Sequence, residues 1–245
     1  MLIDLHAHSS GISYCCRATS EEIIKVAKEN GIDGIVLTNH YQKSYVKDGN
    51  ALAFARKYTD ESREAKRIGK ELGVTVIYGI EVTMSRHDDS HLLIYGLDEA
   101  FTEEFPELYD MTQEELYTLV KARGGLLSQA HPFRNRYYPL DPRFLDGYEL
   151  SSHPLYRTSR YDDVMSLVIK HGSLLTTGAD YHHDVPYRPY CGLFLPDSVK
   201  DERSLVCAML SSDPITLALH EPEDAKKYLV TYSRKNGTVT KEEIE

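Results

Sequence analysis

The first eight residues, Met1-Leu-Ile-Asp-Leu-His-Ala-His8, contain the feature that best predicts the fold. The apolar residues after Met1 are typical of a short buried strand, and two histidines end it. Side chains of a strand repeat every two residues on the same face, so we expect His6 and His8 to point the same way. Two imidazoles that converge on one point provide half of a metal site.

Composition limits the class of protein. A chain of 245 residues is long enough for one large core, and we expect one domain over residues 1–245. No apolar stretch approaches the roughly 18 residues of a membrane span. The strand starts so close to Met1 that we expect no cleaved signal peptide. The net charge of −10 argues against a nucleic-acid partner but is compatible with a small anionic substrate, because bound metal ions dominate the local field.

The cysteines indicate the compartment. Cys15 and Cys16 are adjacent, and together with Cys191 and Cys207 they show no disulfide framework. Disulfides are rare in reducing compartments, so we expect a cytoplasmic protein.

Predicted strands and helices alternate along the chain. A helix is expected over 20–30, with Thr19 or Ser20 as its N-cap and Gly31 beyond its end. Further helices are expected over 50–72, 102–123 (interrupted near Pro106 and at 110–112) and 162–171. The predicted strands are 2–5, 34–38, 74–82, 92–95, 125–129, 147–150 and 174–177, with short additional strands at 194–196 and 228–232.

This alternation favours parallel strands joined by helical crossovers. About seven such strands predict an α/β fold that is a closed or nearly closed (β/α) barrel, whose chemistry lies at the C-terminal ends of the strands. Residues from about 213 to 245 are less apolar, and we expect them to form an appendage packed on the barrel.

Six of the eleven histidines and two carboxylates fall where predicted strands end. A single histidine of this kind is usually a hydrogen-bonded core residue. Eight ionisable groups buried together are costly unless their charge is compensated, and divalent metal ions supply that compensation. Nitrogen and oxygen ligands suit Zn, Mn or Fe(II). The eight residues are His6, His8, His40, Glu81, His91, His131, Asp180 and His182.

This pattern resembles the PHP (polymerase and histidinol phosphatase) family of metal-dependent phosphoesterases. The matching blocks run in the family's order from the first strand to about residue 183. The resemblance implies a distorted (β/α)7 barrel, in agreement with the alternation. The blocks are Asp4-Leu-His6-Ala-His8, Leu37-Thr-Asn-His40, Gly79-Ile-Glu81, His91, Ala130-His131-Pro132-Phe133-Arg134 and Gly178-Ala-Asp180-Tyr-His182.

The resemblance also implies ligands for two to three divalent ions, with Glu81 bridging the first two. Two cations about 3.5–4 Å apart can share a bridging hydroxide and clamp the attacking and leaving oxygens of a displacement. The implied sets are His6, His8, Glu81 and Asp180 for the first ion, Glu81, His91 and His131 for the second, and His40 with His182 for the third.

The chain departs from the family pattern in the loop 9–17, where relatives usually have an Asp or His that completes the third site. Counting forward from His8 places Ser13 or Tyr14 there, and counting back from the next helix places Cys15 there. A thiolate can bind zinc, but a partly buried thiol with no metal role is an equal alternative. Asn39 replaces the Asp that many relatives have before the histidine, which removes a charge and keeps a hydrogen-bonding group.

Other residues near the strand ends are candidates for supporting roles. Arg134 follows His131 by three residues, and its guanidinium can bind a phosphate bidentately. Arg17 is a weaker candidate for the same role. Glu149 ends a predicted strand and is expected to orient a ligand histidine rather than bind metal. His153 either faces the pocket or has a structural role. Among the 18 tyrosines, those that follow predicted strands either line a pocket or pack the loops.

The predicted function is a metal-dependent phosphoesterase that hydrolyses a small phosphate monoester or nucleotide phosphate by a metal-bridging hydroxide and releases phosphate. Glu81, Asp180, Arg134 and His182 are the expected catalytic residues. One alternative is an amidohydrolase-type enzyme that cleaves C–N or C–O bonds. Another is a metal-binding regulatory module without activity. A nuclease or proofreading role is disfavoured by the acidic charge.

Overall fold

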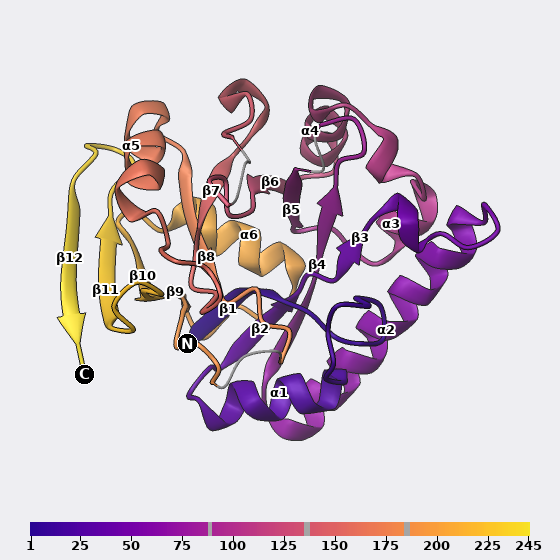
Figure 1. Ribbon diagram of the computed structural model, residues 1–245, viewed down its shortest axis with the longest axis horizontal. Helices are drawn as coiled ribbons and strands as arrows, with labels where there is room; N and C mark the ends of the chain where they lie inside the picture. Colours follow the sequence, from indigo (N-terminus) through magenta and orange to yellow (C-terminus); the bar gives the residue numbers. More distant parts are fainter. Residues whose placement is uncertain (88–89, 135–137, 184–186) are drawn as a thin grey trace.

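The computed structural model describes residues 1–87, 90–134, 138–183 and 187–245, and its fold is mixed α/β (Figure 1). The described strands form one curled sheet in the order β12-β11-β10-β9-β1-β2-β4-β5-β6-β7-β8, with β3 paired to β4. The strands are β1 Leu2–Ala7, β2 Gly34–Leu37, β3 His40–Tyr41, β4 Thr75–Thr83, β5 His91–Tyr95, β6 Leu126–Gln129, β7 Gly147–Ser151, β8 Leu174–Gly178, β9 Gly192–Phe194, β10 Ile215–His220, β11 Lys227–Tyr232 and β12 Val239–Ile244.

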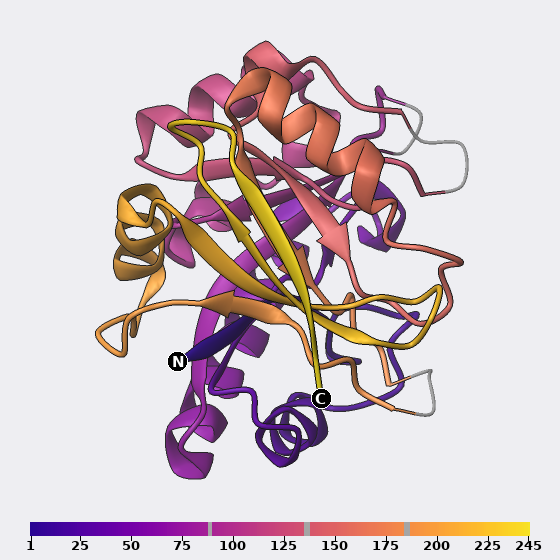
Figure 2. The same ribbon diagram turned by 90° about the vertical axis from the view of Figure 1, so that its left-hand side faces the viewer.

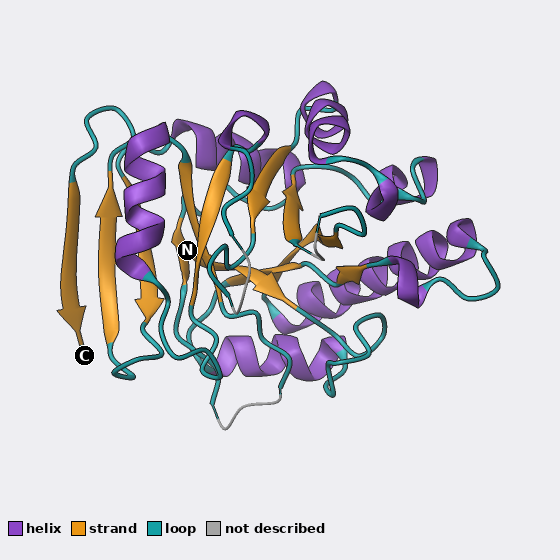
Figure 3. Cartoon of the chain, turned by 45° about the horizontal axis from the view of Figure 1, so that its top comes forward, coloured by secondary structure: helices purple, strands orange, loops and turns teal. Residues whose placement is uncertain are grey.

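The helices surround the strands on the outside of the curl (Figure 3). The expected helix over 102–123 is divided, as Pro106 predicted. Capping boxes begin α1 at Thr19 and α4 at Thr112, and Gly73, with φ 73°, ends α2. The helices are α1 Ser20–Glu29, α2 Ala51–Leu72, α3 Ala100–Glu104, α4 Gln113–Ala122, α5 Tyr161–His171 and α6 Glu202–Ser211, with short 3-10 turns η1 Lys43–Tyr45, η2 Leu108–Asp110 and η3 Pro142–Phe144.

The strands from β1 to β8 form the expected distorted barrel, which closes where the first and last of them meet. A parallel bridge joins Ala7 to Tyr181, and the His8 N–H donates to the Tyr181 carbonyl at 3.1 Å. Glycine is required at Gly178, since a Cβ there would lie 2.3 Å from the Cβ of His6. The close approach brings the ends of β1 and β8 to one rim of the barrel.

One strand runs against the predicted direction. β5 pairs antiparallel with both β4 and β6, whereas the sequence indicated parallel strands throughout. The segment between β4 and β5 is too short for a helical crossover, so the chain turns back directly. His91 therefore begins its strand instead of ending one, and the reversal still places it at the rim where the parallel strands end.

Residues 213–245 continue the sheet. β10, β11 and β12 form an antiparallel meander that joins the barrel through β9, which pairs with β1 (Figure 2). Sequence reasoning anticipated β9 and β11 but not α6, β10 or β12. None of the helices in the described part of the chain is both long and apolar enough to cross a membrane.

Candidate metal centre

All eight predicted ligands lie at the rim where β1 and β8 meet. His6 belongs to β1, His8 directly follows that strand and Glu81 belongs to β4, and each is fully buried. The others come from β3, from the start of β5 and from the loops after β6 and β8: His40, His91, His131, Asp180 and His182. Two of them have positive φ angles, 30° for His131 and 50° for Asp180. Such strain in residues other than glycine is typical of functional sites.

The four residues expected to hold the first ion form one buried group. One nitrogen or oxygen from each of His6, His8, Glu81 and Asp180 lies within 4.8 Å of the others. The Nε2 of His8 is 2.9 Å from Asp180 Oδ1, and the Nε2 of His6 is 3.4 Å from Glu81 Oε1. The two strands that close the barrel thus supply three of the four groups from their ends.

Glu81 is at the middle of the centre. Five imidazole nitrogens lie within 3.4 Å of its carboxylate: those of His6 (3.4 Å), His8 (3.4 Å), His40 (2.6 Å), His91 (2.8 Å) and His131 (3.3 Å). A single carboxylate in contact with ligands from both expected sets is in the position that a bridging ligand requires.

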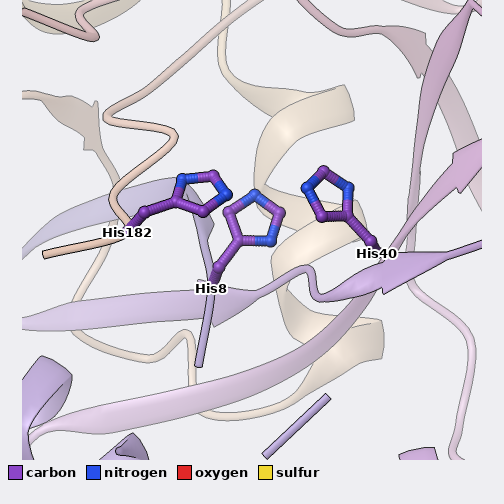
Figure 4. A group of neighbouring side chains, drawn as sticks. All are labelled: His8, His40 and His182. Carbon is purple, nitrogen blue, oxygen red and sulfur yellow. The ribbon is translucent and has the colours of Figure 1, made fainter. Parts of the chain in front are cut away.

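His40 and His182, assigned to the third ion, lie on either side of His8. The three rings face one another in Figure 4, with ring centroids 4.4 Å apart for His8 and His40 and 4.1 Å apart for His8 and His182. Their nitrogens form a further group within 4.8 Å, and His182 also groups with His153 and Asp180. His153, left open by the sequence, therefore faces the centre.

The loop after β1 supports the centre through Ser13. Its hydroxyl contacts Nδ1 of His8 at 3.1 Å, donates to Asn39 at 2.8 Å and accepts the N–H of His40 at 3.0 Å. Asn39 therefore keeps the hydrogen-bonding role expected of it. Because Ser13 holds the ring of His8 from the side opposite Nε2, its role is to orient that ligand.

Cys15 is the residue of this loop that lines the cavity over the centre together with His40 and His182. The ring of Tyr14 packs against that of Tyr45, with centroids 4.4 Å apart. Interactions of the Cys15 thiol with His182 and His40 outweigh its partial burial and lower its pKa to about 6. Burial disfavours the charged form of His40, but Glu81 and Cys15 raise the pKa of His40 to about 10. Arg17 points into solvent, and only its backbone contacts His182.

The residues present fit divalent ions. His6 Nε2, His40 Nδ1 and Glu81 Oε2 are buried and have no hydrogen-bond partner in the described part of the chain, although other ligand atoms lie close to them. Leaving a buried polar atom unsatisfied costs about 1–3 kcal/mol. Ions bound among them would satisfy all three atoms, and nitrogen with carboxylate oxygen is a donor set for Zn, Mn or Fe(II).

The charge states of the centre follow from the contacts between its carboxylates and its histidines. Burial raises the pKa of Glu81, but the neighbouring histidines, His40 above all, hold it well below its usual range. His6 acts in the same way on the buried Asp180. Burial lowers the pKa of His8 well below its usual value. The carboxylates and His8 are thus in the forms that bind metal. Despite burial, neighbouring carboxylates raise the pKa values of His6 and His40, which would release a proton when a metal ion binds.

Glu149 in β7 orients two of these groups. It accepts a hydrogen bond from Nδ1 of His6 at 2.8 Å and from the backbone N–H of His131 at 3.0 Å. With Nδ1 engaged, His6 presents Nε2 to the centre. A carboxylate behind a ligand histidine is a common device for fixing its tautomer, and the sequence anticipated this role.

A second buried carboxylate, Asp4, joins the two closing strands. It accepts hydrogen bonds from the N–H groups of His6 (3.0 Å) and Ala179 (3.1 Å). The side chain of Arg188, fully buried, donates to it at 2.5 Å and lies over the ring of Tyr181. Arg188 was not anticipated, because nothing in its neighbourhood in the sequence relates it to a residue 184 positions away.

Arg134 and Tyr156 lie beside the centre. The hydroxyl of Tyr156 donates to Asp180 Oδ2 at 2.6 Å, and the guanidinium of Arg134 lies 4.0 Å from the same oxygen and 5.1 Å from the centroid of the Tyr156 ring. A cavity of about 380 Å³ opens over these groups. It is lined by Cys15, His40, His91, Arg134, His153, Leu155, Tyr156, Asp180 and His182.

Two solved structures have a similar fold. PsfC from Pseudomonas syringae PB-5123 has a TM-score of 0.59 at 17% identity, covering 89% of this chain and 91% of PsfC. An amidohydrolase from Chromobacterium violaceum, with bound sulfate and no metal, has a TM-score of 0.53 at 17% identity, covering 85% of this chain and 97% of that one.

Sequence comparison identifies the family. An uncharacterised protein of Methanocaldococcus jannaschii is 30% identical in a 166-residue alignment that covers 61% of this chain and 81% of that protein. Residues 4–168 match the PHP domain, and they include the closing strand β1, the bridging position Glu81 and the orienting carboxylate Glu149. The chain therefore belongs to the PHP domain family.

Proposed function

We propose that this protein is a metal-dependent phosphoesterase that hydrolyses a small phosphate monoester. Its family and its buried groups of histidines and carboxylates support a metal-dependent hydrolase. The observation that favours a phosphoester is the guanidinium of Arg134, which lies at the edge of the centre and lines the cavity above it. Guanidinium groups match the geometry of phosphate oxygens.

In this proposal His6, His8, Glu81 and Asp180 hold the first ion. Glu81 also serves the second, with His91 and His131. His40 and His182, joined by Cys15, serve the third. When bound, Zn, Mn or Fe(II) ions would act as Lewis acids on the phosphoryl group and lower the pKa of water.

The other side chains position and stabilise the substrate. Arg134 binds the non-bridging phosphoryl oxygens and stabilises the charge that develops on them. His182 donates through Nδ1 to the backbone carbonyl of Asp180 at 2.7 Å, which leaves Nε2 for the cavity. Where the third site holds no ion, protonated His40 or His182 is the source of the proton for the leaving alkoxide. Tyr156 holds Asp180 in place.

The proposal extends to substrate and compartment. The excess of acidic residues disfavours nucleic acid, and the cavity over the centre suits a small phosphorylated molecule, with phosphate as a product. No disulfide joins the four cysteines in the described part of the chain, which supports a reducing cytoplasm.

The test is a substrate panel with protein reconstituted in turn with Mn, Zn and Fe(II). We expect hydrolysis of phosphomonoesters that disappears on chelation and returns with metal, and no comparable hydrolysis of amides or lactones. Preference for amides or lactones would favour the amidohydrolase alternative. Bound metal without hydrolysis of any compound in the panel would favour the regulatory module.

A further inference from the structure

A second cavity adjoins the metal centre. Its volume is about 460 Å³, and it lies between the turn after β6 and the segment that connects β7 to α5. Arg134, Leu155 and Tyr156 line both this cavity and the one over the centre, so the two spaces meet at these side chains. A molecule with its phosphoryl group at the metal centre would extend its remainder into the second cavity.

The second cavity is cationic in an acidic protein. Arg134, Arg157 and Arg160 line it, and no Asp or Glu is among the described residues of its lining. The chain as a whole has a net charge of −10. Three guanidinium groups therefore line one cavity of an acidic protein. Arg134 and Arg160 each also lie near a carboxylate, so Arg157 contributes the least compensated charge.

The arginines differ in what holds them. Arg160 is paired with Asp163, at 2.6 Å from Nη2 and 2.7 Å from Nε, and its guanidinium lies 5.3 Å from the centroid of the Phe133 ring. These contacts fix its position before any ligand binds. Arg157 makes no ion pair with another described residue, so its charge is available to a ligand.

The backbone between these two arginines is also held in place. Glu221, which follows β10, accepts hydrogen bonds from the N–H of Ser159 at 2.8 Å and from its hydroxyl at 2.5 Å. Both residues are buried. The segment that carries Arg157 and Arg160 is thus anchored to the C-terminal strands, as expected of a preorganised binding wall.

We propose that Arg157 and Arg160 bind a second anionic group of the substrate, so that the preferred substrates are phosphomonoesters whose leaving group carries a carboxylate or a further phosphate. This inference rests on the proposed function, and it narrows the substrate class. Guanidinium groups form charge-assisted hydrogen bonds with either anion. A leaving group that carries an amine would meet like charge and is disfavoured.

Binding of phosphonates, which cannot be hydrolysed, tests the inference directly. With manganese-loaded protein, calorimetry compares phenylphosphonate, 4-carboxyphenylphosphonate and 1,4-phenylenediphosphonate. We expect the two ligands with a second anion to bind about tenfold more tightly, the effect of one or two added charge-assisted hydrogen bonds. Comparison of the affinities for 4-carboxyphenylphosphonate and 1,4-phenylenediphosphonate shows whether the arginines prefer a carboxylate or a phosphonate group.

Variants then show whether Arg157 and Arg160 cause the tighter binding of ligands with a second anionic group. The Arg157→Ala/Arg160→Ala protein should lose the preference, and Arg157→Gln alone should lose most of it. Arg63→Ala, on the exposed face of α2, should keep it. Equal binding of all three phosphonates by the unaltered protein would overturn the inference, as would a preference that persists in the double variant.

Hydrolysis separates this inference from the proposed function. Phenyl phosphate and 4-carboxyphenyl phosphate should both be cleaved, with kcat/KM about tenfold higher for the second. If the protein preferred the phosphonates that carry a second anionic group but hydrolysed neither ester, the result would contradict the phosphoesterase and support the arginine site. If both esters were hydrolysed at equal kcat/KM and all three phosphonates bound equally, the result would support the phosphoesterase and contradict the arginine site.

Discussion

The barrel strands β1–β8 and the C-terminal strands β9–β12 belong to one sheet, yet the barrel strands alone contribute to the groups of potential metal ligands found among the described residues. The barrel strands curl until their ends meet, so a side chain after one strand faces side chains from several others. The antiparallel C-terminal strands do not curl back, and their ends remain apart. Curvature, more than the number of histidines and carboxylates, determines where a centre can form.

Each region has a buried carboxylate that shows the difference. Glu149, in the barrel, accepts hydrogen bonds from the His6 ring and the His131 backbone. Glu221, beyond β10, accepts hydrogen bonds from Ser159. The first orients a ligand histidine, and the second anchors a loop. Substitutions in the two regions should therefore have different consequences.

The largest effect is expected for the carboxylate at the middle of the barrel centre. Glu81→Gln should reduce phosphomonoester hydrolysis by more than about 100-fold, because it removes a direct ligand, and losing an outer partner alone costs about 10–100-fold. Steady-state kinetics with measured metal content provide the check, and Glu114→Gln on the exposed face of α4 is the control. Full activity in Glu81→Gln with all ions bound would contradict its assignment as the bridge.

A second prediction concerns stability. Arg188→Met should lower the free energy of unfolding by about 3–5 kcal/mol, since it leaves the fully buried charge of Asp4 without a partner. Lys241→Met in β12 removes a cation over the rings of Tyr161 and Tyr228 and should cost about 1 kcal/mol or less. Urea unfolding of metal-free protein measures both. Equal losses would show that the closure at β1 and β8 has no special role.

A third prediction compares the two buried carboxylates Glu149 and Glu221. Glu149→Gln should weaken metal affinity by about 10–100-fold, because His6 loses the acceptor that fixes its tautomer. Glu221→Gln should leave metal affinity unchanged. Competition with a chromophoric chelator measures the two constants. If the two variants lost affinity equally, general destabilisation would explain both results.

The smallest effect is expected at Cys15. With cobalt in place of the native metal, a thiolate ligand gives a charge-transfer band in the near ultraviolet. We expect this band in the unaltered protein, and we expect Cys15→Ser to remove it while Cys207→Ser, on α6, retains it. A band of equal intensity in Cys15→Ser would assign the thiol a structural role.

The barrel was more predictable than the C-terminal strands. Apart from the two-residue β3, which was not predicted, the strands from β1 to β8 are largely buried and flanked by caps and glycines, so the sequence shows their position within a few residues. The direction of β5 follows from its short connection to β4, and the predicted strands 74–82 and 92–95 already contained this signal, which the general β-α-β alternation concealed. β12, Val-Thr-Lys-Glu-Glu-Ile, is an exposed edge strand with no apolar alternation, and it forms because β11 provides a partner.

The centre was predictable as a set of residues but not in its supporting contacts. Histidines and carboxylates after apolar runs identify the groups that meet at the rim. Arg188, the hydrogen bond from Tyr156 to Asp180 and the contact of Ser13 with His8 depend on how distant loops fold over the barrel. The choice among Ser13, Tyr14 and Cys15 likewise needed the path of the loop.

Anomalous X-ray scattering from crystals of the reconstituted protein tests the central claim most directly. The account predicts one peak among His6, His8, Glu81 and Asp180 and a second beside Glu81 next to His91 and His131. Density maps without a peak in contact with Glu81, from protein saturated with manganese or zinc, would contradict it.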